Sequence, residues 1–200
     1  IKELIQKKKI KLIYNINKTK LNFKHTKIKI IKKDLTKLIN LKKFKDEIDY
    51  AVILAFKINY NDTDAKKYKN INDKIIKKLL KICKKNNIKK ILYASTNGVY
   101  GLTNKLANER THIYPTNIYH KLKIDYEKKI SKFCESKKIN YCVMRFSGIY
   151  GKGIHSNIIQ KFLKMKNENQ IIQLNGDGKQ KRDFLYIKDL SEAIFKLINI

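Results

Sequence analysis

The sequence predicts an α/β fold, in which helices cover a doubly wound parallel sheet. Short apolar runs alternate with amphipathic segments of about 10–20 residues, the pattern of successive βαβ units. One run, residues 49–55, is almost continuously apolar, as expected for a strand in the middle of a parallel sheet. The chain has 200 residues, 42% of them hydrophobic, which is enough for one globular domain with a sizeable core.

The periodicity of the apolar residues assigns each segment to a strand or a helix. We expect strands at residues 10–14, 27–31, 49–55, 88–94, 140–146 and 171–174. We expect the end of a helix at residues 1–8 and further helices at residues 36–44, 65–85, 118–136, 156–166 and 189–199. This alternation, rather than any single segment, carries the predicted fold class.

The positive charge of the chain is a candidate signal for nucleic-acid binding. There are 47 Lys and Arg residues against 17 Asp and Glu residues, a formal net charge of +30. Nearly all of the basic residues are Lys, they are spread along the whole chain, and Ile and Asn are abundant too. We interpret this as compositional drift toward AT-rich codons, and we predict no specific nucleic-acid partner.

The chain shows no sign of a membrane or metal-binding class. No stretch approaches the roughly 18 uncharged apolar residues that cross a bilayer. Cys83, Cys134 and Cys142 lie in apolar segments without metal-ligand spacing. We therefore expect buried reduced thiols in a cytoplasmic protein, with no metal site and no membrane partner.

Residues that are rare in this chain gather in its second half. Arg offers a planar bidentate fork that Lys cannot reproduce, and Gly allows a positive φ or the close approach of a ligand. The rare residues are Arg110, Arg145 and Arg182, the single Pro115, and seven glycines that all follow residue 97. The glycines fall just after predicted strands, which points to one functional edge of the sheet.

Tyr119 and Lys123, four residues apart, are the strongest candidates for a reactive pair. In the helix predicted there, this spacing puts the phenol and the ammonium on one face. A nearby ammonium lowers the phenol pKa from about 10, so Tyr119 can give or take a proton near neutral pH. Thr96 ends the preceding strand and could hydrogen-bond the same substrate hydroxyl. The set suits oxidation or reduction of a sugar alcohol.

The spacing of this pair is weak evidence by itself. Tyr14 and Lys18 show the same spacing, as chance allows in so lysine-rich a chain. The alternative interpretation of Tyr119 and Lys123 is a half-buried Tyr beside a solvated Lys on an amphipathic helix. The order of the neighbouring motifs favours the reactive pair.

Four segments carry a resemblance to a known family. They are residues 95–101 (STNGVYG), 109–123 (Glu, then Pro115, Tyr and Lys), 145–151 (RFSGIYG) and 176–189 (GDGKQKRDFLYIKD). In this order they resemble the extended short-chain dehydrogenase/reductase family and, more narrowly, the NAD-dependent epimerases and dehydratases of nucleotide sugars. The resemblance covers essentially the whole chain. It implies a Rossmann-like NAD(P)-binding domain over residues 1–200, truncated at both ends.

The resemblance implies roles for particular residues. Tyr119 would be the general acid/base, Lys123 would bind the nicotinamide ribose and tune Tyr119, and Thr96 would hydrogen-bond the reacting hydroxyl. Binding of NAD or NADP would involve Asn15, Asp34, Leu35, Ala55, Asn72 and Ser95, together with Tyr119 and Lys123. A nucleotide-sugar substrate would contact Thr96, Ser147 and Arg182.

Two arginines receive different roles. Arg182 would grip the nucleotide diphosphate through its bidentate fork. For Arg145, a structural ion pair is favoured over substrate contact. The resemblance is also compatible with a homodimer.

Several departures from the family pattern qualify these expectations. No Gly precedes residue 98, so the Gly-rich turn that holds the pyrophosphate would lie upstream of Ile1. Asn15 stands where an Asp usually binds the ribose, which leaves NAD against NADP open. Asn97 and Gly98 stand where the 4,6-dehydratases carry an acid pair, which disfavours elimination of water. Leu122 replaces the usual small hydroxyl residue.

The leading hypothesis is an NAD(P)-dependent nucleotide-sugar epimerase or reductase. Two alternatives remain open at this point. The chain could be a catalytically inactive protein of the same fold that binds RNA through its basic surface, or a non-functional gene fragment. The joint presence of Thr96, Tyr119 and Lys123 speaks against the first alternative.

Overall fold

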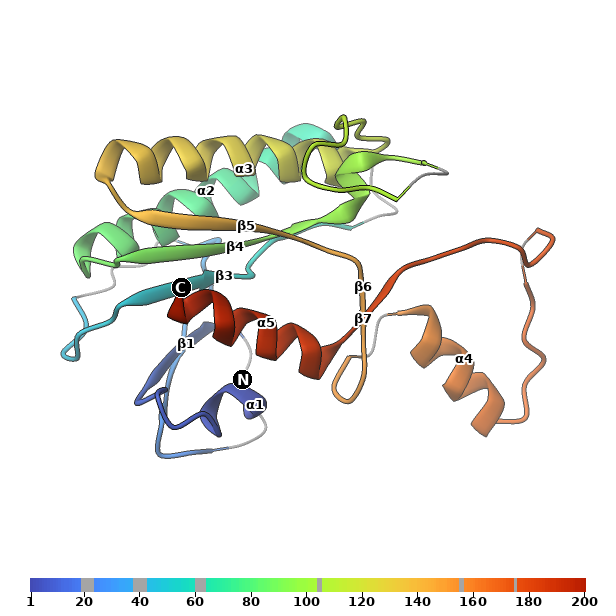
Figure 1. Ribbon diagram of the computed structural model, residues 1–200, viewed down its shortest axis with the longest axis horizontal. Coiled ribbons are helices and arrows are strands. Elements are labelled where there is room, and N and C mark those ends of the chain that lie inside the picture. Colours follow the sequence, from blue (N-terminus) through green and yellow to red (C-terminus); the bar gives the residue numbers. More distant parts are fainter. Residues whose placement is uncertain (19–23, 38–42, 60–63, 104–105, 155–156, 175) are drawn as a thin grey trace. The chain divides into compact units, whose positions relative to one another are not determined.

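The structure is a computed structural model that describes residues 1–18, 24–37, 43–59, 64–103, 106–154, 157–174 and 176–200. The chain divides into two compact units. The larger comprises residues 2–145, and the smaller comprises residues 146–200 with Ile1. Both contain helices and parallel strands (Figure 1).

A three-stranded sheet forms the centre of the larger unit. Its strands lie in the order β3 (Tyr50–Ile53), β4 (Lys90–Thr96) and β5 (Asn140–Phe146). β3 and β4 run parallel, with Ala51 opposite Ile91. Consecutive residues of β4 are buried, because both of its faces are covered. This explains the continuous apolar pattern of the segment.

Two long helices pack beside this sheet and lie on the same face of it (Figure 1). The first, α2 (Ala65–Lys85), begins where the Asp64 side chain accepts a hydrogen bond from Lys67 N at 2.8 Å. The second, α3 (Ile118–Lys137), begins where Asn117 accepts a bond from His120 N at 2.9 Å. Both caps satisfy backbone N–H groups that have no partner within the helix.

One contiguous core joins the sheet to these helices. Its buried members come from β3, β4, α2, α3 and the connection between α2 and β4, and the rings of Tyr93 and Tyr126 are the largest side chains that are almost fully buried. The remaining buried members are Ile53, Tyr68, Ile76, Cys83, Ile88, Ile91, Leu122, Ile130 and Cys134. This core fixes α3 against β4, and both of these elements carry candidate site residues.

Three further elements belong to the larger unit. They are the short helix α1 (Lys2–Ile5) and the strands β1 (Ile13–Asn17) and β2 (Ile28–Lys32). β1 and β2 form a separate parallel pair, with Asn15 opposite Ile30. A single 3-10 turn, η1 (Asn97–Tyr100), follows directly on β4.

The smaller unit contains a second parallel pair and two helices. The strands are β6 (Gly148–Tyr150) and β7 (Phe184–Tyr186), with Gly148 opposite Phe184. The helices are α4 (Ile158–Asn167) and α5 (Ile187–Asn199). Leu190, Ser191, Ile194 and Ile198 are the buried residues of α5.

Most elements predicted from the sequence are confirmed. α2 and β5 have the predicted bounds, and the pairing is parallel wherever its direction is given. The strand predicted at residues 171–174 is wrong, because no strand forms there and Ile171 is 90% exposed. Of the helix predicted at residues 36–44, residues 38–42 lie outside the described part, and the described residues 36–37 and 43–44 are not helical. The short strands β6 and β7 were not predicted.

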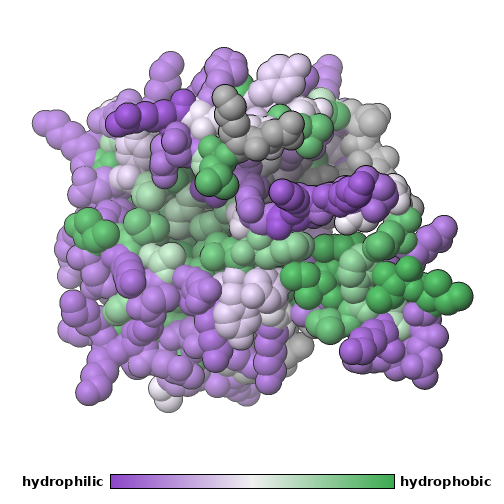
Figure 2. All heavy atoms as spheres, turned by 45° about the vertical axis from the view of Figure 1, so that its right-hand side comes forward, coloured by the Kyte–Doolittle hydropathy of each residue, from purple (hydrophilic) through white to green (hydrophobic). Residues whose placement is uncertain are grey.

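The surface agrees with the composition. Hydrophilic side chains are spread over much of the visible face rather than gathered in one patch (Figure 2). Within the described residues, no helix is long and apolar enough to pass through a bilayer.

Candidate active site

The carboxyl end of β4 and the turn η1 form the first part of the site. The Thr96 hydroxyl accepts a hydrogen bond from Gly98 N at 3.2 Å and so caps the turn. Gly98 packs directly on the His120 ring, and a Cβ at this position would lie 2.7 Å from His120 Cε1. Only a glycine therefore lets the turn approach the first turn of α3 this closely.

Lys123 is a buried ammonium beside the same strand end. Only 4% of the surface of Lys123 is exposed, and its Nζ donates a hydrogen bond to Ala94 O at 2.7 Å. Three aromatic rings surround Nζ, with centroids at 4.3 Å (Phe56), 5.0 Å (Tyr93) and 5.7 Å (Tyr119). The electron-rich faces of such rings stabilise a cation that has lost its water.

Burial lowers the pKa of Lys123 to about 8, while the Glu127 carboxylate acts in the opposite direction. Lys123 can thus be partly neutral slightly above physiological pH, unlike an exposed lysine. Such a group is able to take part in proton transfer or to adjust its charge to a neighbour.

Tyr119 lies one helical turn before Lys123, and the prediction that both share one face of a helix is confirmed. The Tyr119 ring is half-buried and meets the Phe56 ring edge-on at 5.5 Å. Thr96, the last residue of β4, lies between Ala94 of the strand, whose carbonyl oxygen accepts from Lys123, and Gly98 of η1, which packs on His120. The structure therefore brings Thr96, Tyr119 and Lys123 to the same end of the sheet.

A network of charged and hydroxyl groups adjoins these residues. Glu127 Oε2 and Arg145 Nη2 are 2.7 Å apart, so the predicted structural ion pair of Arg145 is confirmed. Ser95 Oγ donates to Glu127 Oε1, and Arg145 Nη1 donates to Tyr100 Oη at 2.9 Å. Ser95, which was predicted to bind the cofactor, thus already donates its hydroxyl hydrogen to Glu127.

The residues predicted to bind the adenosine side lie in the middle of β1 and just after β2. Asn15 Oδ1 is buried and has no hydrogen-bond partner among the described residues. Asp34 accepts bonds from Thr36 N and Thr36 Oγ1 at 2.9 and 2.6 Å, and Lys18 Nζ lies 3.3 Å from it. These bonds, led by the Thr36 hydroxyl, lower the pKa of Asp34 to about 2. Leu35, the next residue, is 8% exposed.

An unpaired buried acceptor fits a ribose hydroxyl, because such an oxygen is costly unless a donor reaches it. Asn15 is the central residue of β1, and Asp34 lies two residues after the end of the neighbouring parallel strand β2. The residues present on this strand pair and just after it therefore fit the adenosine part of a dinucleotide.

Ala55 lies in the loop that follows β3, and Asn72 of α2 bonds to this loop. Asn72 is fully buried, and its amide bonds only backbone groups: it accepts from Lys57 N and donates to Lys57 O and Tyr68 O, each at 2.8 Å. Asn72 therefore ties the loop to α2, and its influence on a cofactor would pass through that loop. Ala55 is partly exposed in the same loop.

Ser147 and Arg182, the predicted substrate contacts, belong to the smaller unit. In the register of β6 and β7, Gly148 pairs with Phe184, and Gly148 N donates to Asp183 O at 3.2 Å. Ser147 and Arg182 both precede this first pair, so the fold brings them to the same end of the two strands. Arg182 is exposed there.

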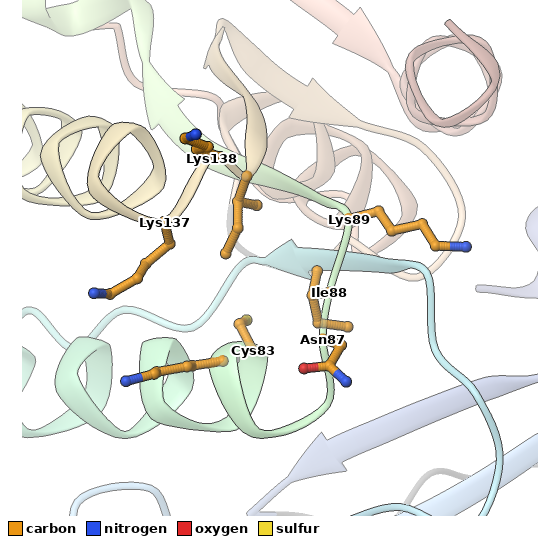
Figure 3. A pocket seen from close by; sticks show the side chains of 8 residues that line it. Cys83, Asn87, Ile88, Lys89, Lys137 and Lys138 are labelled. Atoms are coloured by element: carbon orange, nitrogen blue, oxygen red, sulfur yellow. The ribbon is translucent and has the colours of Figure 1, made fainter.

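A pocket of about 350 Å³ lies at the opposite end of the central sheet (Figure 3). Cys83 and Ile88 lie in it, whereas Lys89 and Lys137 extend away in different directions. These ammonium groups do not converge on a ligand, and burial raises the pKa of the Cys83 thiol to about 12, which leaves it unreactive.

Other candidate ligands do not form a site. Across the described residues, no group of three or more His, Cys, Asp and Glu side chains could hold a metal ion. His112 is exposed, His120 packs against Gly98, and His155 lies outside the described residues. Cys134 is buried and Cys142 is partly buried, both as free thiols.

The sequence interpretation missed Glu127 and two of the aromatic partners of Lys123, Phe56 and Tyr93. Glu127 follows Lys123 by four residues and Tyr119 by eight, so helical spacing could have placed all three on neighbouring parts of one face. Phe56 gave no such signal, because its approach to Lys123 depends on the path of the loop after β3.

A parallel α/β fold whose candidate residues lie at the carboxyl end of a strand is typical of dinucleotide-binding proteins. The comparison with known families agrees over the full length: residues 1–200 match the NAD dependent epimerase/dehydratase family. The chain belongs to this family.

Two curated relatives show the range of the family. A dTDP-D-glucose 4,6-dehydratase from Dictyostelium discoideum is 30% identical over 188 residues, which are 86% of this chain and 43% of the relative. A putative UDP-glucose 4-epimerase from Methanocaldococcus jannaschii is 33% identical over 179 residues, which are 84% of this chain and 56% of the relative. The chain thus spans about half the length of these relatives.

Solved structures share the fold. A UDP-N-acetylglucosamine 4-epimerase from Methanobrevibacter ruminantium is 27% identical with a TM-score of 0.75, over 90% of this chain and 60% of that one. A UDP-glucuronic acid 4-epimerase from Bacillus cereus in complex with NAD has a TM-score of 0.85 at 21% identity, over 99% of this chain and 68% of that one. The fold is therefore that of the Rossmann-type epimerases.

Proposed function

We propose that the protein is an NAD(P)-dependent nucleotide-sugar epimerase or reductase, with Tyr119 as the general acid/base. The observation that carries the proposal is the grouping of Thr96, Tyr119 and Lys123 at the carboxyl end of β4. Family membership supports the class of substrate and cofactor.

Each of the three side chains has a task that its position supports. Tyr119 Oη would remove the proton from a sugar hydroxyl, and the positive charge of Lys123 would favour the phenolate that results. The Thr96 hydroxyl uses a lone pair for Gly98 N, so its hydrogen remains able to donate to the sugar oxygen. A bound nicotinamide would supply the acceptor and donor of the hydride.

The side chains near the strand end favour hydride transfer without loss of water. Elimination needs an acid to protonate the departing hydroxyl, and residues 97–98 are Asn and Gly. The carboxylate of this network, Glu127, is occupied by Arg145 and Ser95. This supports an epimerase or a reductase, although a 4,6-dehydratase is among the relatives.

NAD is the cofactor that the adenosine end supports. The ionised Asp34 would repel the additional phosphate of NADP, and Lys18 is already paired with Asp34 rather than available for that phosphate. Lys123 and Tyr119 would hold the nicotinamide ribose, and Asn15 would accept from the adenine ribose.

Incubation of the intact protein with NAD and a panel of UDP-hexoses tests the proposal. An epimerase interconverts the C4 epimers without net formation of NADH, whereas a reductase consumes NADH in proportion to a 4-keto sugar. Formation of a 4-keto-6-deoxy sugar would show that the predicted reaction type is wrong. A protein that turns over none of these sugars and binds RNA selectively would favour the RNA-binding alternative.

A further inference from the structure

A buried ion pair joins four elements around the proposed site. Glu127 of α3 and Arg145 of β5 have side chains only 9% and 20% exposed. Arg145 Nε and Nη2 reach the two Glu127 oxygens at 3.2 and 2.7 Å. Ser95 of β4 donates to the same carboxylate, and Tyr100 of η1 accepts from Arg145 Nη1 at 2.9 Å.

Stability alone is a poor explanation for this pair. Removing two charges from water costs about as much as their attraction returns, and apolar residues of the same volume often fill such a site equally well. Here the pair is nonetheless fully bonded, with three hydrogen bonds to the Glu127 carboxylate. Hydrogen bonds of this kind fix the orientation of the side chains that they join, whereas apolar packing constrains that orientation far less.

We propose that Glu127 and Arg145 are positioning residues, which hold the end of β4 and the turn η1 against the face of α3 that carries Tyr119 and Lys123. This proposal rests on the function proposed above, because it concerns the geometry of the same reaction.

The ion pair between Glu127 and Arg145 would act through the geometry of β4. Successive side chains of a strand point to opposite faces, so fixing Ser95 against Glu127 also fixes the direction of the Thr96 hydroxyl. Tyr100 ends η1, and its bond to Arg145 holds the far end of the turn that Thr96 caps. The guanidinium also lies 5.1 Å from the centre of the Tyr100 ring.

The pair is electrically balanced, which matters for the proton on Tyr119. The other ionisable groups around Tyr119 and Lys123 come from α3 itself and from the elements packed against it. They are Tyr93 of β4, Tyr100 of η1, His120 of α3 itself, and Asp73 of α2, which Tyr126 of α3 contacts. Removing one member of the pair leaves the charge of the other uncompensated.

The test compares Glu127→Gln with Arg145→Met in the intact protein. Glu127→Gln leaves a net positive charge, which stabilises a phenolate, so the apparent pKa of Tyr119 should fall by on the order of half a unit. Arg145→Met leaves a net negative charge, so that pKa should rise. The double variant should return to the wild-type value. The readout is an ultraviolet titration of phenolate, taken as the difference between each protein and its Tyr119→Phe counterpart.

Tyr100→Phe is the matched control, because it removes one hydrogen bond and no charge, and it should leave the pKa of Tyr119 unchanged. In kinetics, Glu127→Gln should lower kcat by about tenfold at nearly constant KM, since no substrate contact is lost. Thermal melting of each variant identifies any that fails to fold. If Arg145→Met unfolds, the kcat of Glu127→Gln together with the direction of its titration shift decides the matter.

The two proposals fail in different ways. An unchanged kcat in Glu127→Gln would overturn the positioning role, and titrations that move in the same direction, or not at all, would overturn the effect of the pair on the Tyr119 proton. Both outcomes leave wild-type turnover intact. A wild-type protein without turnover of any nucleotide sugar would overturn the proposed function, and the titrations would still decide whether the ion pair controls Tyr119.

Discussion

Two lysines at opposite ends of β4 have opposite environments. Lys89 directly precedes the strand, its side chain is 65% exposed, and its Nζ lies 2.7 Å from Asp49 Oδ1. The hydrogen bond to Asp49 raises the pKa of Lys89. Lys123 lies against the other end, 4% exposed among three aromatic rings, and burial lowers its pKa to about 8.

The difference shows that residue type carries little information in this chain. With 47 Lys and Arg residues, a lysine marks a reactive position only where the fold removes its water and supplies a polar partner. The amino end of the sheet holds solvated ammonium groups, and the carboxyl end holds a desolvated one. The predictions below test this contrast.

The largest effect is expected for Tyr119→Phe, compared with Tyr141→Phe. Tyr141 is also a partly exposed phenol of the larger unit, but it lies near the start of β5 and donates to Glu135 at 2.9 Å. Loss of the acid/base oxygen should reduce kcat by about 10²–10⁴-fold without loss of NAD binding. Tyr141→Phe should leave kcat unchanged. Steady-state kinetics and calorimetric titration measure both, and near-normal turnover of Tyr119→Phe would remove the chemical basis of the proposal.

Lys123→Met should change how stability depends on pH. The folded pKa of Lys123 lies below the unfolded value of 10.5, so the unfolded chain binds more protons between about pH 8 and 10.5. Wild-type stability should therefore gain about 3 kcal/mol from this group as pH rises through that window. Lys123→Met should lack this gain, and urea unfolding across the pH range measures it.

Lys89→Met is the matched control for that experiment. The pKa of Lys89 is raised in the folded state, so its contribution is present below about pH 10.5 and is lost above the folded pKa. Its effect should have the opposite sign and be small, because the pair is exposed to solvent. Equal pH dependence of the two variants would contradict the contrast between the two ends of the strand.

Arg182→Lys should have a smaller effect, confined to substrate binding. The charge stays while the bidentate fork is lost, so the affinity for a nucleotide sugar should fall by about 1–3 kcal/mol. Arg110→Lys, another exposed arginine, is the control. An unchanged KM in Arg182→Lys would show that the guanidinium does not bind the diphosphate.

The smallest effect is expected from the many exposed lysines together. They should bind RNA only without sequence preference, and affinity should fall steeply with salt, because diffuse charge releases counterions without reading bases. A gel-shift assay at about 150 mM salt measures this. Sequence-selective binding at that salt would mean that the basic surface is a specific site.

The repeating elements of the fold could be predicted from sequence because their signals are local. The apolar periodicity and the Asp64 cap fixed the bounds of α2, and the apolar run of β5 did the same. Ile171 to Leu174 looked equally apolar but forms no strand, and β6 and β7 are only three residues long. Whether so short a segment pairs depends on a distant partner, which its own sequence does not show.

The site was predictable only as far as helical spacing reaches. Tyr119 and Lys123 follow from their separation of four residues, whereas the approach of Phe56, 67 positions before Lys123, does not. Arg145 stood out in the sequence because arginine is rare in this chain. Its partner Glu127, however, is known only from the structure, where the two side chains meet. The assignment of Asn15, Asp34, Ser147 and Arg182 to ligands stays a prediction.

The bonds of Asn72 make one backbone hydrogen a reporter of local opening. Lys57 has an exposed side chain, yet its N–H donates to an oxygen of the fully buried Asn72. Exchange of that hydrogen with solvent therefore requires the loop to part from α2, which would also carry the neighbouring Phe56 ring away from Lys123. A slow exchange rate at this single amide would measure how often the ammonium is uncovered.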